Sequence, residues 1–240
     1  MDSKKLNIKP LVGARKSDAD VTFPVSDREL CDRYAAVSTP MVNDVLRRMG
    51  ILYQTLPTSI LPLHEGMDVC GLAFTIKGSK NLDITDEMEE RAKMLESIPE
   101  DSVCVWDTSN DDESAQWGEI MTMAAKRRGC RGAIVDGGVR DTDKVLSQDF
   151  PVFCRYRTSN GMMGRFRMIG YQIPIRIGGV DINPGDVICA DIDGVIVVPR
   201  RLAWEVLLEA EEILRNEIEI KKMVESGTTP SEVVKNGGYF

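Results

Sequence analysis

Two short segments carry side chains suited to the chemistry of small organic acids. Residues 117–121 (WGEIM) place Glu119 at an expected helix start, and residues 137–141 (GGVRD) end in Arg140 and Asp141. The guanidinium of Arg140 is a planar, permanently charged fork that matches a carboxylate. The carboxylate of Asp141 suits a hard cation such as Mg²⁺, which takes one or two protein carboxylates and keeps several waters. The two segments together predict a site that binds an acid beside a metal.

The helix start contributes backbone groups to the same site. The first amides of a helix have no intrahelical partner, so those that follow Gly118, at Ile120 and Met121, can receive an anion. Glu119 supplies a second carboxylate that could reach the metal directly or through water. Gly137 and Gly138 would let the backbone approach a ligand closely.

Each of these residues also has an ordinary structural role open to it. Asp141 could cap the short helix expected after it. Glu119 could lie in a first helical turn because the helix dipole favours an acid there. Arg140 could form a surface ion pair, and Asp136, before two glycines, has the character of a turn residue.

Residue counts exclude several other kinds of site. The single histidine, His64, lies in an expected surface loop, so a zinc site built on two or three histidines is impossible within one chain. A Ser-His-Asp or Cys-His site could depend only on His64. The six cysteines form no CxxC pair and several lie in apolar runs, which is typical of core cysteines in a reducing cytoplasm.

Composition indicates an ordinary globular protein. The 240 residues are 42% hydrophobic and 28% charged, with a net charge of −8. An acidic chain without a long basic run is a poor ligand for nucleic acid. No apolar run approaches the roughly 18 residues of a membrane span, and the first residues lack the apolar core of a signal peptide. We therefore expect a cytoplasmic protein with no nucleic-acid or membrane partner.

The elements around the two segments suggest a parallel strand–helix–strand unit. A helix over residues 118–128 ends at Gly129, and a strand over residues 132–135 follows it. We expect a tight turn at residues 136–138, a short helix to Leu146 and a strand over residues 151–154. Short connections between such elements are typical of parallel sheets.

The rest of the chain predicts one α/β domain with a mixed central sheet flanked by helices. Residues 1–25 are expected to form an N-terminal arm, residues 26–225 the domain and residues 226–240 a C-terminal tail. The other expected helices and strands cover residues 27–34, 41–49, 69–76, 83–96, 103–106, 173–177, 187–190, 195–198 and 202–223.

The spacing of the acidic and basic residues resembles that of a known family. Glu119 lies 21 positions before Arg140, and Arg140-Asp141 follows the run GAIVDGGV. This resembles the RraA-like family, which contains 4-hydroxy-4-methyl-2-oxoglutarate/4-carboxy-4-hydroxy-2-oxoadipate aldolases and the regulator of ribonuclease activity A. The resemblance covers roughly residues 30–200 and includes STP at residues 38–40, FPVF at 150–153, PGDV at 184–187 and DIDGV at 191–195.

The resemblance implies a fold and an activity. The fold would be the RraA-like one, similar to a swivelling phosphohistidine domain (β/β/α), in a homotrimer or hexamer. The activity would be that of a class II pyruvate aldolase that cleaves 4-hydroxy-2-oxo acids and decarboxylates oxaloacetate. Asp141 would hold Mg²⁺ or Mn²⁺, Glu119 would support it through water, and Arg140 would stabilise the enolate oxygen. The amides of Ile120 and Met121 would receive the substrate carboxylate. With no histidine nearby, a water polarised by the metal or held by Arg140 is the expected base.

One departure leaves alternatives open. Aldolase members commonly carry a carboxylate three residues after the Asp of Arg-Asp, where this chain has Lys144. The alternative is a non-catalytic regulator that acts by contact with a protein partner. A third reading is a Schiff-base aldolase that uses Lys77. The segment 161–164 (GMMG) resembles an addition to the family core that could reshape the substrate pocket.

Overall fold

A computed structural model describes Lys9, Asp18 and residues 20–238. Its centre is a nine-stranded mixed sheet in which seven strands follow the order β1-β6-β5-β3-β2-β10-β11, with β4 paired to β5 and β7 paired to β2. Strands β2, β3, β5 and β6 run parallel to one another. The expected single α/β domain with a mixed sheet is confirmed. Among the described residues, no helix has the length and apolar character needed to cross a membrane.

The strands and helices have the following bounds. The strands are β1 Leu61–Pro62, β2 Val69–Lys80, β3 Ser102–Asp107, β4 Ala115–Trp117, β5 Gly132–Val139, β6 Val152–Arg157, β7 Phe166–Tyr171, β8 Ile175–Ile177, β9 Val180–Ile182, β10 Val187–Asp191 and β11 Gly194–Val198. The helices are α2 Asp27–Tyr34, α3 Thr39–Arg48, α4 Glu87–Glu96, α5 Glu119–Arg127, α6 Thr142–Leu146, η1 Arg200–Leu202, α7 Ala203–Glu225 and α8 Pro230–Lys235. Strands β8 and β9 form a separate hairpin.

Apolar side chains on both faces of the sheet make two cores. Along β10, Val187 and Cys189 join the core shared with α2, α3 and α7, whereas Ile188 and Ala190 join the larger core under α4, α5 and α6. Alternate side chains of a strand point to opposite faces, so β10 contributes to both. The two inner parallel strands, β3 and β5, are accordingly buried along their whole length, as expected of strands covered on both faces.

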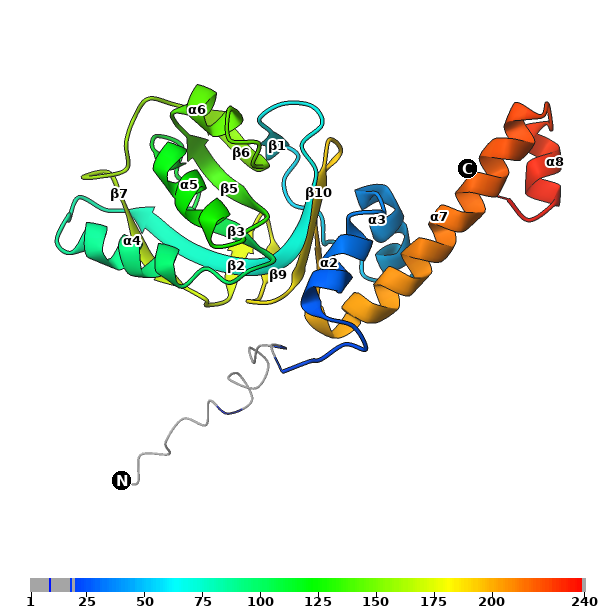
Figure 1. Ribbon diagram of the computed structural model, residues 1–240, viewed down its shortest axis with the longest axis horizontal. Helices are drawn as coiled ribbons and strands as arrows, with labels where there is room; N and C mark the ends of the chain where they lie inside the picture. The colour runs from blue at the N-terminus through cyan, green and yellow to red at the C-terminus, as the bar shows by residue number, and fades with distance from the viewer. Residues whose placement is uncertain (1–8, 10–17, 19, 239–240) are drawn as a thin grey trace, which may run out of the picture.

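The helices divide between the two cores. Figure 1 shows α4, α5 and α6 gathered over the parallel strands, and α2 and α3 beside β10 with the start of α7. Beyond Ile213, α7 runs away from the sheet, and α8 folds back beside its far end (Figure 1). The segment expected to be a C-terminal tail therefore carries a helix. Most of the expected arm, residues 1–8, 10–17 and 19, lies outside the described residues.

The expected turn at residues 136–138 is wrong. Strand β5 continues through these residues to Val139, and its register with β6 shifts between Val135 and Gly138. Glycine is needed here because neighbouring residues pack closely against the backbone of β5, and not because the chain turns. A Cβ atom on Gly138 would lie 2.5 Å from the ring of Tyr156 and 2.6 Å from the carbonyl oxygen of Ser114. Real Cβ atoms essentially never approach other atoms so closely, so β5 can pass between β4 and β6 only because glycine stands here.

Candidate active site

A cavity of about 410 Å³ lies where β5 ends and α5 begins, and all six predicted site residues line it. These residues are Gly118, Glu119, Ile120, Met121, Arg140 and Asp141. The carboxyl ends of parallel strands are where open α/β sheets place their ligands. The two segments singled out in the sequence, 16 or more residues apart, therefore meet at one opening.

Backbone contacts fix the end of β5 against β4. The amide of Arg140 donates to the carbonyl oxygen of Trp117 at 3.0 Å, which joins the two predicted segments directly. Behind them, the amide of Gly138 donates to the side-chain oxygen of Gln116 at 3.0 Å, and the Gln116 amide donates to Asp111 at 2.6 Å. These buried bonds orient the peptide chain that leads into Arg140 and Asp141.

Asp141 stands at the N-cap position of α6 but does not cap it. Its backbone is left-handed, with φ 53°, and its side chain accepts no hydrogen bond from the helix. The Oδ2 atom lies 3.4 Å from Nε of Arg140, and both side chains are about half exposed, at 46% and 50%. The capping role therefore does not explain this carboxylate, which remains accessible from the cavity.

Gly118 lets α5 begin directly against Asp141. A Cβ atom at this residue would lie 3.1 Å from Oδ2 of Asp141 and 3.3 Å from Cγ of Arg140. Gly118 is also the N-cap of α5, so no side chain covers the first amides of the helix. Those amides have no partner within the helix, and they lie beside a guanidinium and a carboxylate.

Glu119 is the other carboxylate of the cavity. Its side chain makes no hydrogen bond or ion pair with any described residue, while its backbone oxygen accepts from Gln148 at 3.3 Å. A carboxylate without a protein partner can accept from a ligand or from a water held by one.

The structure adds lining residues that the sequence did not single out as site residues. They are Met88, Arg91 and Leu95 from α4, Ala115, Gln116 and Trp117 from β4, and Gly161, Met162, Met163 and Arg165 from the segment before β7. A Cβ atom on Gly161 would lie 2.8 Å from a guanidinium nitrogen of Arg140, so the GMMG segment packs directly against that group. The sequence indicated that the GMMG segment could reshape the pocket. For Arg91 it indicated only a place in a charged helix.

The charges that line the cavity favour an anionic ligand. Three guanidinium groups, of Arg91, Arg140 and Arg165, face two carboxylates. Arg91 pairs with Glu87 at 2.8 Å, and its buried Nε has no hydrogen-bond partner. An orphaned buried donor next to an open cavity is a group that an acceptor could satisfy.

The acidic groups fit a sparse metal site only. Among residues 20–238 with Lys9 and Asp18, no cluster of three or more His, Cys, Asp or Glu side chains could enclose a metal ion. Mg²⁺ needs no such cluster, because one or two carboxylates and several waters suffice. The half-exposed Asp141 carboxylate, in the space that the missing Cβ of Gly118 leaves open, meets this requirement.

The remaining candidates lie elsewhere. His64 is exposed in the loop before β2, as expected, and Lys144 lies 3.7 Å from Asp143 on α6 without lining the cavity. Lys77 lies inside β2, not after it, and donates to Asp107 at 2.6 Å in a different cleft. All six cysteines are buried thiols.

Comparison with known proteins gives a consistent picture. The family model described as "RraA-like: Aldolase/RraA" matches residues 30–197. The chain is 32% identical to the "Putative 4-hydroxy-4-methyl-2-oxoglutarate aldolase" of Halalkalibacterium halodurans over 179 residues, which is 75% of this chain and 80% of that protein. It is 32% identical to DlpA of Legionella pneumophila over 95% of its own length but spans only 35% of the DlpA chain.

Two solved structures share the fold over most of the chain. One, described as belonging to novel cellulases from microbes associated with the gut ecosystem, is 48% identical with a TM-score of 0.86, covering 89% of this chain and 96% of that one. The other is RraAS2 of Streptomyces coelicolor, described as an unusual member of the RNase ES inhibitor RraA protein family. It is 27% identical with a TM-score of 0.74, covering 83% of this chain and 99% of that one.

Proposed function

Because the chain belongs to the RraA-like family of aldolases and RraA proteins, we propose that it is a carbon–carbon lyase of small 2-oxo acids. The specific form of this proposal is a divalent-metal-dependent class II pyruvate aldolase that cleaves 4-hydroxy-2-oxo acids and also decarboxylates oxaloacetate. The observation that carries it is the meeting of Glu119, Arg140, Asp141 and the free amides of α5 in one cavity.

Substrate binding follows from the positions of the positive groups. The uncapped amides of Ile120 and Met121 would receive the carboxylate of the 2-oxo acid, where the helix dipole favours negative charge. Arg140 would donate to the 2-oxo oxygen from the other side of Gly118. Arg165, which lines the same cavity, is available for a second carboxylate at the far end of a diacid.

When the carbon–carbon bond breaks, electrons move toward the 2-oxo oxygen of the substrate. The 4-hydroxyl group loses its proton, and a carbonyl forms at C4 as the C3–C4 bond breaks. The electron pair of that bond generates the enolate of pyruvate. In oxaloacetate, C4 is a carboxylate carbon, so cleavage of the C3–C4 bond releases carbon dioxide and leaves the same enolate. Arg140 stabilises the negative charge that develops on the enolate oxygen, and a fixed donor in place before the reaction is the most effective kind. A water held by Glu119 is the candidate that accepts the hydroxyl proton and then protonates C3.

The proposal includes Mg²⁺ or Mn²⁺, with Asp141 as its protein ligand and Glu119 in support through water. When bound, such an ion acts as a Lewis acid that polarises the 2-oxo group. A site with oxygen ligands only suits these hard cations better than zinc.

The alternative function is that of a non-catalytic regulator that binds a protein partner. The likeness to RraAS2 and the lysine at position 144 favour it. The open, unpartnered Glu119 and the uncapped helix start favour the enzyme, because a surface that acts by protein contact needs neither. Apolar side chains around the opening, with Ile120 70% and Met88 57% exposed, support the further proposal that subunits associate here as a homotrimer.

The test is pyruvate release by the purified chain. We expect pyruvate from oxaloacetate and from 4-hydroxy-4-methyl-2-oxoglutarate, loss of both activities in EDTA, and recovery with Mg²⁺ or Mn²⁺. Release that persists in EDTA, with borohydride trapping substrate on Lys77, would overturn the metal-dependent form. No release from either substrate would leave the regulator as the better account. Soluble cellulose is the control substrate, and release of reducing sugar from it would contradict the lyase assignment.

A further inference from the structure

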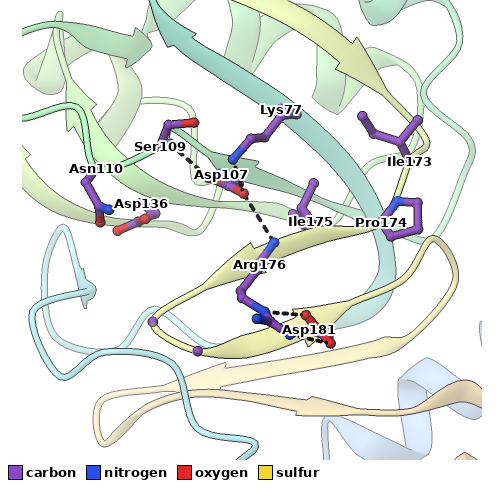
Figure 2. A pocket seen from close by; sticks show the side chains of 12 residues that line it. Lys77, Asp107, Ser109, Asn110, Asp136, Ile173, Pro174, Ile175, Arg176 and Asp181 are labelled. Carbon is purple, nitrogen blue, oxygen red and sulfur yellow. Dashed lines mark hydrogen bonds and ion pairs between the residues drawn. The ribbon is translucent and has the colours of Figure 1, made fainter. Parts of the chain in front are cut away.

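A second and larger cleft, of about 790 Å³, shares no residue with the Arg140 cavity. Figure 2 shows it between the parallel strands and the β8–β9 hairpin, with Lys77, Asp107 and Asp136 on the strand side and Arg176 and Asp181 on the hairpin. No step of the proposed lyase reaction uses these side chains.

A row of four charged side chains crosses four adjacent strands here, and three of them, Lys77, Asp107 and Asp136, line the cleft. Lys77 is in register with Asp107, and Asp136 and Arg155 directly follow the registered residues Val135 and Cys154. The order across β2, β3, β5 and β6 is therefore positive, negative, negative, positive. Neighbouring parallel strands are about 4.8 Å apart, so Asp107 and Asp136 lie on adjacent strands. The positive charge that can balance each of them comes from the outer strand on its own side, from Lys77 for Asp107 and from Arg155 for Asp136.

The two acidic groups differ in how well they are satisfied. Asp107 accepts from Lys77 at 2.6 Å, from the Ser109 amide at 2.8 Å and from the Arg176 amide at 3.2 Å. Asp136, only 6% exposed, has one ion-pair partner, Nε of Arg155 at 3.4 Å. Within the part of the chain that the structure describes, the Asp136 carboxylate accepts no hydrogen bond. This buried carboxylate lines the cleft with its acceptor capacity unused.

The charges around Asp136 are balanced, but some of the hydrogen-bonding groups there have no partner. Each charged group has an opposite partner, because Lys77 pairs with Asp107, Arg155 with Asp136, and Arg176 with Asp181 at 2.6 Å. Asn110 also lines the cleft, and its side chain makes no hydrogen bond with any described residue. A site whose charges already balance offers little to an ion, but a carboxylate that accepts no hydrogen bond and an amide without a partner can take hydroxyl groups.

Part of the opposite wall is apolar. Ile173, Pro174 and Ile175 line it, and Ile173 is 40% exposed. Small-molecule sites commonly combine an apolar wall with a few convergent polar groups. A polyol or sugar presents both kinds of surface, since its C–H groups can pack on such a wall while its hydroxyls point to the other side.

We propose that this cleft binds a small, neutral, polyhydroxylated ligand. Asp136 accepts hydrogen bonds from its hydroxyl groups, Asn110 both donates and accepts, and the segment from Ile173 to Ile175 packs against its carbon skeleton. Lys77 donates to Asp107 and Arg176 donates to Asp181, so Asp136 is the carboxylate of the strand row that still accepts no hydrogen bond from a described residue.

The test uses three probes with one pyranose skeleton and three charges: D-glucose, D-glucuronate and D-glucosamine. The ¹⁵N-labelled full chain is titrated with each at pH 7.5, and amide shifts are followed by NMR. We expect D-glucose to shift the amides of Ser109, Asn110 and Arg176 in a saturable way, and to bind more tightly than either charged probe. Asp136→Asn should weaken D-glucose binding roughly tenfold, because hydrogen bonds to a charged acceptor are the strong ones.

Asn110→Gly should weaken binding about threefold or more, since glycine keeps the left-handed backbone at φ 61° and removes only the amide. Asp149→Gly is the matched control, with an exposed residue at φ 49° outside both cavities, and should leave binding unchanged. Absence of a saturable shift with D-glucose would overturn the proposal. So would equal affinity in folded Asp136→Asn, or preference for either charged probe.

Discussion

Gly118 and Asp141 approach each other so closely that a Cβ atom on Gly118 would lie 3.1 Å from Oδ2 of Asp141. The contact joins the start of α5 to the end of β5, and both groups line the candidate active site. Space for a ligand on the Asp141 carboxylate therefore depends on the absence of a side chain at residue 118.

Gly118→Ala should reduce activity with little effect on folding. The backbone at Gly118 is extended, with φ −173°, so alanine brings no backbone strain. Its methyl group would force Asp141 and Arg140 to move by a few tenths of an ångström. We expect pyruvate release from oxaloacetate to fall about tenfold or more in kcat/KM, since small displacements of positioned groups are costly. A melting temperature near that of the wild type, with activity within about twofold, would contradict this.

Arg140→Lys should lower kcat/KM by about 100-fold. Lysine keeps the positive charge but loses the planar pair of donors that holds the carboxylate and the enolate oxygen. Arg165→Lys is the matched control in the same cavity, and it should act mainly on KM for diacids. Steady-state kinetics on oxaloacetate distinguish the two variants. A change below about threefold in Arg140→Lys would make Arg140 a structural residue.

Asp136→Asn should stabilise the protein at neutral pH. Burial raises the pKa of Asp136 to about 6, while Arg155 lowers it and Asp107 raises it further. The folded protein therefore binds more protons than the unfolded chain between about pH 4 and pH 6, so wild-type stability falls as pH rises through this window. Asparagine mimics the protonated form. The stability advantage of the variant should be near zero at pH 4 and rise to as much as about 3 kcal/mol at pH 7.5.

Urea unfolding at both pH values measures this difference. Asp143→Asn, at an exposed carboxylate on α6, is the control and should show no comparable change with pH. A variant that is less stable than the wild type at pH 7.5 would mean that the ion pair with Arg155 outweighs the cost of burying the charge.

The sequence predicted the chemistry of the candidate site better than the shape around it. Glu119, Arg140 and Asp141 could be singled out because their types and neighbours indicate an acid-binding site, and all three line one cavity. Gly137 and Gly138 were misinterpreted because Asp-Gly-Gly is typical of a turn. The contacts that demand glycine at residue 138 come from Ser114 and Tyr156, which no local pattern brings near.

The parts that could not be predicted depend on register and on segments distant in the chain. The row Lys77, Asp107, Asp136 and Arg155 exists only because four strands align in one particular register, which single-strand patterns do not specify. Strand β7 was missed because Arg167 and Gly170 interrupt its apolar pattern, and β9 was missed because it has only three residues, one of them Asp181. Arg91 and Arg165 reach the cavity from α4 and from the segment before β7, and their spacing in the sequence does not indicate this.

The most direct test of the lyase account is the oxaloacetate decarboxylase activity of Asp141→Asn at saturating Mg²⁺. The Asp141 side chain does not cap α6, and its contact with Arg140 is half exposed, so the substitution should change the free energy of unfolding by less than about 1 kcal/mol. The account predicts that the folded variant loses nearly all metal-dependent pyruvate release. A variant that releases pyruvate near the wild-type rate would show that Asp141 holds no metal and would contradict the account.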